Sequence, residues 1–583
     1  MALILLRKPP SNYSKLFLGR CEGFPVFATY PMPAQQTPAA APAQGIAAGL
    51  LSSRSTPTQS STPAHVSPDK TEDFTAASQL PRPHPELLHV HHRWQTPGQP
   101  QEPAQPLQLP HPQLHRQSQA TAPDFNDHQQ AFRHKTTARL LQTLAVFRAC
   151  GFPLFVQNAM HLYKGSRTLI GQAATDAIVR RTFFKQFCGG ECDQSIKPVL
   201  AYLHQHGIGP IINYAAEDAV ASTNPHNTKS SNDVAEAACD QACKIFRKSI
   251  QDAAATAGLG FMAIKVSALG SPSMLKRASA ALTEQGIADM WPGEGSALRP
   301  HDTPVEMLQG SLTQEDSTAL DNATQRVLSL AQTAASLGNV RMMIDAEHIY
   351  MQPAIDAIAL EAQRSVNMGR AVVLQTYQCY LKSTPSRLAG DVSLAARQGW
   401  TFGGKLVRGA YLVHEVEQAK LLGQPRPVHD SLLETHACYD RCVEQLMQKA
   451  GQSNVEMMVA SHNQQSIEKA VALMQQLGIS PSDNGVYFGQ LYGMSDHLSF
   501  TLGPHGYQAY KVIPYGPIET TMPYLTRRAQ ENSDIFKKSG VGKELEMIKA
   551  ELARRLVAFF KPSGWQRPSL STQPGAATVL PSA

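Results

Sequence analysis

The sequence has few cysteines, no apolar run long enough to span a membrane, and no glycine-rich phosphate loop. Nine cysteines among 583 residues cannot form the dense disulfide framework of a small secreted domain. A membrane-spanning helix needs roughly 20 consecutive apolar residues, and no segment approaches that length. The missing loop excludes phosphate binding of the Rossmann or P-loop type.

Metal-binding and nucleic-acid-binding motifs are also missing. Three cysteine pairs have the spacing CxxxC, but no adjacent histidine completes a four-ligand zinc site, so we expect reduced thiols and no metal site. The 52 basic and 46 acidic residues give a net charge of +6, and no basic stripe is interleaved with aromatic residues. We therefore expect no nucleic-acid partner. The three pairs are Cys188/Cys192, Cys239/Cys243 and Cys438/Cys442.

Acidic residues are nearly absent from the N-terminal region, where Glu22 is the only one among the first 68 residues. Arginines and lysines are present there, and the apolar run Ala2 to Leu6 is too short for a secretory signal. This composition predicts a mitochondrial transit peptide over residues 1–32. Residues 33–126 are rich in Pro, Gln, Ala and Ser and predict a disordered linker, because so few apolar residues cannot offset the entropy of ordering.

Periodic apolar sequence begins at about residue 127. Apolar residues at three-to-four spacing predict a helical segment over residues 127–197. Over residues 198–537, eight short apolar runs alternate with helical stretches, which predicts an α/β fold, a closed (β/α)₈ barrel of the TIM type. Residues 286–317 are expected to be a loop insertion. Residues 538–583 are expected to form a C-terminal helix and tail.

Polar residues follow most of the eight apolar runs. The carboxyl ends of barrel strands meet at one mouth, where such barrels place their active sites. We therefore expect a site built from these side chains. They are Tyr214, Glu217, Lys265, Asp345, Glu347, Gln375, Lys405, Arg408, His462, Gln490 and Tyr515.

Two adjacent arginines, Arg527 and Arg528, lie in a helical pattern with Tyr524 and Glu531. A guanidinium holds a carboxylate through two parallel hydrogen bonds, and Glu531 is three and four residues from the arginines, on the same side of a helix. This arrangement indicates a site for a small carboxylate. A solvated arginine pair with an ordinary helix salt bridge is the alternative.

With these motifs in view, the chain resembles the proline dehydrogenase family of the eukaryotic mitochondrial type, from about residue 131 to 535. The resemblance implies a distorted barrel with FAD bound noncovalently at its mouth. It implies oxidation of L-proline to Δ1-pyrroline-5-carboxylate, with electrons passed to a membrane quinone. It also implies peripheral association with the matrix side of the inner mitochondrial membrane. The motifs are IDAEHIYMQPAID, QTYQCYL, KLVRGAYLVHE, MVASHN, FGQLYGMSDHLS and YGPIETTMPYLTRRAQEN.

The resemblance also implies roles for individual residues. Arg527 and Arg528 would clamp the proline carboxylate, with Glu531 supporting them. Bacterial members have RLVK where this chain has KLVR, and the lysine at position 405 cannot reproduce a bidentate arginine contact. The rest of the implied substrate pocket is Lys265, Asp345, Tyr411, Leu491 and Tyr515; the implied FAD contacts are Gln375, Lys405, Val407, Arg408, Ala410 and His462.

Several alternatives remain open on the sequence. A metal-dependent barrel hydrolase would use Asp345, Glu347, His348 and His462 as ligands, although the first strand lacks the paired histidines of such enzymes. An inactive barrel could serve as a binding scaffold. Within the family, relatives specific for hydroxyproline carry a smaller residue in place of Tyr515, so this tyrosine favours proline as the substrate.

The segment 542–562 has a second open interpretation. Leu545, Ile548, Leu552, Leu556 and Phe559 lie on one face of its helical pattern. Packing against the barrel is the first interpretation, and an interfacial membrane helix is the alternative.

Overall fold

The computed structural model describes residues 122–560, except 216–230, 257, 286–305, 307, 309, 451–453, 484 and 539; the side chains of 231–233 and 531–541 are likewise outside the description. The predicted transit peptide, nearly all of the linker, Glu217, most of the insertion and the Glu531 side chain fall outside these described residues. None of the described helices is long and apolar enough to cross a membrane.

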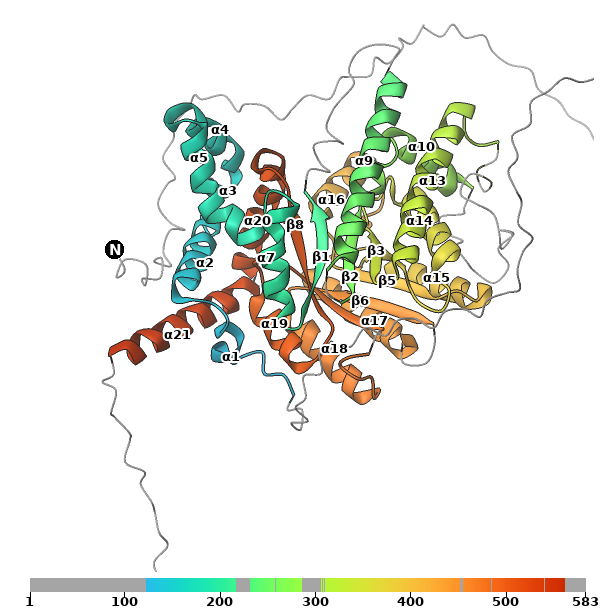
Figure 1. The fold of residues 1–583 in the computed structure, drawn as a ribbon. Coiled ribbons are helices and arrows are strands. Elements are labelled where there is room, and N and C mark those ends of the chain that lie inside the picture. The colour runs from blue at the N-terminus through green and yellow to red at the C-terminus, as the bar shows by residue number, and fades with distance from the viewer. Residues whose placement is uncertain are drawn as a thin grey trace, which may run out of the picture. The chain divides into compact units, whose positions relative to one another are not determined.

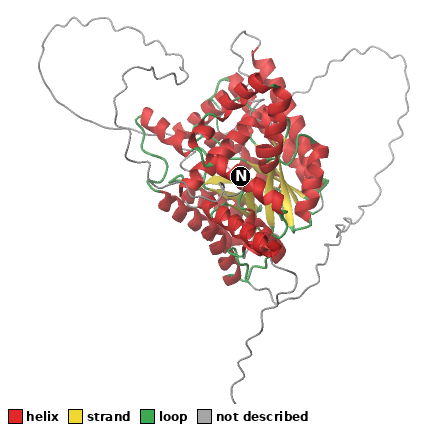
Figure 2. Ribbon diagram, turned by 90° about the vertical axis from the view of Figure 1, so that its left-hand side faces the viewer, coloured by secondary structure: helices red, strands yellow, loops and turns green. Residues whose placement is uncertain are grey.

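Eight parallel strands close into a barrel in sequence order, as predicted, and helices surround them (Figures 1 and 2). The barrel is uneven, because β1 and β8 share seven register pairs whereas β1 and β2 share two. The strands are β1 (Ile208–Tyr214), β2 (Gly260–Ile264), β3 (Val340–Ile344), β4 (Val373–Gln378), β5 (Phe402–Val407), β6 (Val455–Ala460), β7 (Val486–Leu491) and β8 (Ala509–Tyr515).

The outer layer consists of α7 (Asp193–His204), which precedes β1, and of helices that follow the strands. It covers the faces of the strands that point away from the interior, so both faces of each strand are buried. The helices that follow the strands are α9 (Ser231–Ala254), α10 (Pro272–Glu284), α13 (Gln314–Leu337), α14 (Gln352–Val366), α15 (Thr384–Gln398), α16 (Leu412–Leu421), α17 (Leu432–Ala450), α18 (Gln464–Gln476) and α19 (Asp496–Leu502).

Alternate strand residues fill the barrel interior. Phe261, Leu374, Met458, Tyr487 and Tyr510 belong to one interior cluster, and each is at most 3% exposed. Their neighbours along each strand point into the outer layer. This two-residue period decides which polar side chains can reach the mouth from inside the barrel.

A second helical layer lies on one side of the barrel, beside β8 (Figure 1). Its apolar side chains form one cluster with those of α20, the helix that carries the arginine pair. These helices therefore hold α20 against the barrel. The layer consists of α1 (His128–Phe132), α2 (Thr137–Cys150), α3 (Pro153–Gln157), α4 (Ala159–Ile170), α5 (Gln172–Val179), α6 (Lys185–Phe187) and α21 (Gly540–Phe560), and α20 spans Ile518–Lys538.

The two interpretations of the C-terminal helix apply to different parts of α21. Leu545 and Ile548 are buried in the cluster with α20, as core packing predicts. Leu556 and Phe559, on the same predicted face, are 58% and 82% exposed. The first half of α21 is therefore a packing element, whereas the last turns leave apolar side chains at the surface.

Candidate active site

Lys265, Asp345 and Lys405 meet at the carboxyl end of the barrel. Lys265 follows β2 and Asp345 follows β3, where the Asp345 amide donates to the Ile264 carbonyl at 2.9 Å. Phe402 and Leu406 on β5 pack into the outer layer, so Lys405 points inward, and its ammonium pairs with the Asp345 carboxylate. Lys405 is 9% exposed, and this ion pair stabilises its charge at the mouth.

Tyr411, which precedes α16, shares this region with Lys265, Asp345 and Arg527. Burial raises the pKa of the Tyr411 phenol to about 12. Lys265 and Arg527 lower that pKa, while Glu347 and Asp345 raise it, so all four charges lie close enough to act on the hydroxyl. The structure thus brings together four of the residues that the resemblance assigned to the substrate pocket.

The charge of Arg528 acts on His462, whereas that of Arg527 acts on Tyr411. The guanidinium carbon of Arg528 lies 4.8 Å from the centre of the Tyr524 ring, one helical turn earlier. Burial, together with the positive charges of Lys511 and Arg528, lowers the pKa of His462 to about 3, so His462 is neutral. Leu491, the last residue of β7, packs against the apolar cluster that includes α20.

Arg408, which directly follows β5, is held by neutral partners. Its three guanidinium nitrogens donate to His436 Nδ1 at 2.9 Å, Ser461 Oγ at 2.7 Å and Ser466 Oγ at 2.7 Å. The guanidinium carbon lies 4.1 Å from the centre of the Tyr439 ring. Burial lowers the pKa of Arg408. A half-buried cation without a carboxylate among these partners is suited to an anionic group of a ligand.

The turn after Arg408 requires glycine at position 409. Its φ is 121°, and a Cβ there would overlap the ring of Tyr380. Val407 is half-buried, and Ala410 is exposed beyond the turn. A backbone without side chain at this point can approach a ligand closely.

His462 is positioned by a residue that the sequence did not reveal. Its Nδ1 lies 3.0 Å from the hydroxyl of Ser495, which has a left-handed φ of 50°. The buried carboxylate of Glu544 on α21 accepts from the amides of Ser495 at 2.8 Å and Asp496 at 3.0 Å. The C-terminal helix therefore fixes the strained turn that carries the His462 partner.

Gln375 does not reach the mouth, which corrects the expectation that it contacts the cofactor from inside the barrel. Leu374 points into the interior, so Gln375 points outward. Its amide donates to Asp356 of α14 at 2.6 Å, and Asp356 pairs with Arg387 of α15. Gln375 thus joins β4 to the outer helices.

Tyr515 is also placed differently from the expectation that it lines the ring pocket. Tyr510 of β8 points inward, so residue 515 points outward. Its ring packs edge-on against Tyr214 at 5.2 Å, and its hydroxyl lies 3.2 Å from Ser249 Oγ on α9. The residue is 4% exposed and packs in the outer core.

The four ligands of the alternative hydrolase are not brought together. Glu347 is 5% exposed and accepts from the Ser267 amide at 3.0 Å, which ties its loop to β2. His348 contacts Glu415, whereas His462 contacts Ser495. Among the described residues, this separation leaves the four-ligand metal site without geometric support.

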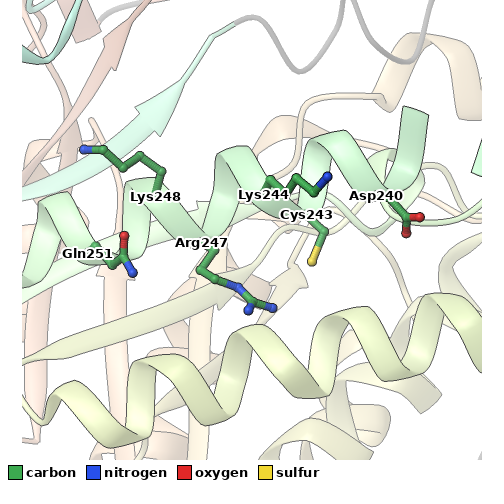
Figure 3. A pocket seen from close by; sticks show the side chains of 6 residues that line it. All are labelled: Asp240, Cys243, Lys244, Arg247, Lys248 and Gln251. Atoms are coloured by element: carbon green, nitrogen blue, oxygen red, sulfur yellow. The ribbon is translucent and has the colours of Figure 1, made fainter. Parts of the chain in front are cut away.

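A shallow pocket along α9 is distinct from the mouth (Figure 3). None of the residues expected at the active site lines it. Its side chains, all from α9, are Asp240, Cys243, Lys244, Arg247, Lys248 and Gln251.

Known proteins resemble this chain over most of its length. Residues 197–539 match the family described as Proline dehydrogenase. The human protein named proline dehydrogenase 1, mitochondrial, is 32% identical over 542 residues, covering 75% of this chain and 90% of its own length. The hydroxyproline dehydrogenase of Rattus norvegicus is 34% identical over 441 residues, covering 73% of this chain and 93% of its own.

A solved structure of proline utilization A from Bdellovibrio bacteriovorus, inactivated by N-propargylglycine, covers 74% of this chain with 17% identity and a TM-score of 0.49. This chain spans 42% of that longer one, and the likeness is too low to support an argument by itself. The family match covers more than half of this sequence, and it coincides with the barrel and α20. The chain therefore belongs to the proline dehydrogenase family.

Proposed function

We propose that this chain oxidises L-proline to Δ1-pyrroline-5-carboxylate, with noncovalently bound FAD as the hydride acceptor and a membrane quinone as the final acceptor. The observation that carries the proposal is the convergence of Arg527, Lys265 and Asp345 on Tyr411 at the barrel mouth. Relatives named mitochondrial support a mitochondrial location, and the matrix side of the inner membrane is part of the proposal.

The residues on one side of the mouth fit FAD. Arg408, with only neutral hydrogen-bond partners, offers positive charge to a diphosphate. Gly409 allows close approach of the backbone, and the neutral imidazole of His462 is held by Ser495. This side also includes Lys405, Val407 and Ala410. Gln375 supports it from the outward face of the barrel. Bound FAD would supply the hydride acceptor.

The positive side chains on the substrate side of the mouth suit proline. Arg527 and Arg528 would hold the proline carboxylate, and Glu531 is proposed to support them from the same helix. Lys265 and Lys405 contribute further positive charge, which lowers the pKa of a nearby amine and favours the neutral form that oxidation requires. Tyr411 and Leu491 would exclude water from the proline ring.

The proposal is tested by product formation. The full chain loaded with FAD should convert L-proline, in the presence of a soluble quinone, to a product that forms the coloured adduct of pyrroline-5-carboxylate with o-aminobenzaldehyde. D-proline serves as the control, because the arginine clamp presents only one ring face to the acceptor. Equal rates with both enantiomers, or no adduct from a folded FAD-loaded chain, would contradict the proposal.

Hydroxyproline is the second candidate substrate, because the rat hydroxyproline dehydrogenase is as similar to this chain as the human proline dehydrogenase. Tyr515 cannot discriminate between them from its outward position. We expect Tyr515→Ser to leave the ratio of kcat/KM for proline over hydroxyproline unchanged. The same change should destabilise the fold by about 3 kcal/mol through lost core packing.

Both quantities are measured on the same preparations, by steady-state kinetics and by urea unfolding. Tyr515→Phe is the matched control, because it removes only the contact with Ser249 and should cost about 1 kcal/mol. A ratio that falls in Tyr515→Ser but not in Tyr515→Phe would show that the side chain reaches the ring pocket.

A further inference from the structure

Two histidines and a glutamate gather beside Tyr411. His348 lies in the loop after β3, and His414 and Glu415 lie in the first turn of α16. The Glu415 carboxylate oxygen is 3.1 Å from His348 Nδ1 and 3.9 Å from His414 Nδ1. One ligand atom from each residue lies within 4.8 Å of the other two.

One buried nitrogen of this cluster lacks a hydrogen bond from the described part of the protein. His414 Nδ1 is buried and has no hydrogen-bond partner within the described part of the chain. A buried polar atom in that state is costly, and a ligand that accepts its lone pair would remove the cost. Glu415, whose side chain is 3% exposed, also accepts from the Ile349 amide at 3.2 Å, which holds its carboxylate in place.

The donor set and its spacing suit zinc. Imidazole nitrogens and carboxylate oxygens bind Zn²⁺ at roughly 2.0–2.2 Å, so tetrahedral ligand atoms lie about 3.3 Å apart. The two distances from Glu415 bracket this value. Three protein ligands leave a fourth position for water.

We propose that His348, His414 and Glu415 form a zinc site at the barrel mouth, and that bound zinc slows proline oxidation. The link to the reaction is geometric, since the His348 ring lies 4.2 Å from the ring of Tyr411. Zinc would fix His348 and the start of α16 together, and thereby restrict Tyr411, which directly precedes α16 and is proposed to contact the proline ring. The slowing of proline oxidation by zinc rests on the proposed function, whereas the zinc site itself does not.

The sequence predicts no metal site here, because neither the cysteine pairs nor the four ligands of the alternative hydrolase correspond to this cluster. In the chain, 67 residues separate His348 from Glu415, so only the fold brings them together. An ion pair between His348 and Glu415 without any metal is the competing explanation.

Equilibrium dialysis separates the two explanations. The full FAD-loaded chain is freed of metal with a chelator and dialysed against micromolar zinc chloride, and bound zinc is counted by elemental analysis. The unmodified chain should bind one equivalent more than His414→Gln or His348→Gln. His161→Gln, which changes an exposed histidine on α4, should behave like the unmodified chain. Equal zinc binding by the unmodified chain and by both cluster variants, each folded by circular dichroism, would overturn the site.

A rate measurement tests whether bound zinc slows proline oxidation. Zinc should slow proline oxidation by the unmodified chain and by His161→Gln, and about tenfold more zinc should be needed for the same slowing in His414→Gln. If zinc occupies the site while the rate stays the same, the coupling to Tyr411 is wrong. If the chain does not oxidise proline at all, the proposed function fails, and the dialysis result still decides the site.

Discussion

Replacing Asp496 with alanine is expected to lower the free energy of unfolding by about 3–5 kcal/mol. The Asp496 carboxylate lies 2.5 Å from Lys135 Nζ and 2.8 Å from Lys511 Nζ, and these lysine side chains are 7% and 0% exposed. Burial alone would raise the pKa of Asp496, but the charges of Lys135 and Lys511 lower it below its usual range. The variant would leave two buried cations without their shared anion.

This prediction is measured by urea unfolding followed by circular dichroism. Asp430→Ala is the matched control, because Asp430 also pairs with two cations, Lys382 and Arg426, but is 67% exposed. Exposed pairs contribute little, so this control should stay within about 1 kcal/mol of the unmodified chain. A similar loss in the two variants would show that the buried network does not hold the N-terminal helices to the barrel.

Replacing either arginine of α20 with methionine is expected to raise the KM for proline steeply while FAD stays bound. Each change removes a charge-assisted contact to the substrate carboxylate, worth roughly 2–4 kcal/mol once the bound substrate excludes water from the contact. Arg528→Met should also raise the pKa of His462, because the Arg528 charge is one of the groups that lower it. Arg527→Met should instead raise the pKa of Tyr411, because the Arg527 charge is one of the groups that lower it.

Steady-state kinetics and the flavin absorption of each variant decide this prediction. Arg397→Met provides a control, since Arg397 is an exposed arginine in the last turn of α15. Its KM should match that of the unmodified chain. An unchanged KM in both α20 variants would show that the two arginines do not bind the substrate and form only an ordinary surface salt bridge.

The barrel could be predicted from sequence because each strand is a short apolar run and each run is local. The direction of single side chains could not. Both faces of a barrel strand are buried, so apolar residues occur at successive positions and the alternation that marks an interior face is lost. For this reason the sequence predicts that Gln375 and Tyr515 lie at the mouth, whereas the structure turns both toward the outer helices.

The supports of the site were hidden for a different reason. Ser495 holds His462 from a segment 33 residues away, and Glu544 fixes Ser495 from 49 residues further along the chain. Lys135 reaches Asp496 from the N-terminal helices. No local pattern marks such pairs, because their proximity results from closure of the barrel and from packing of α21.

The flavin spectrum of the full chain, recorded without oxygen before and after addition of L-proline, tests the central claim most directly. The proposed function predicts that the visible absorption of oxidised flavin is lost when proline is added and returns with a quinone. A folded chain that binds FAD and keeps its yellow colour in the presence of L-proline would contradict the proposed function.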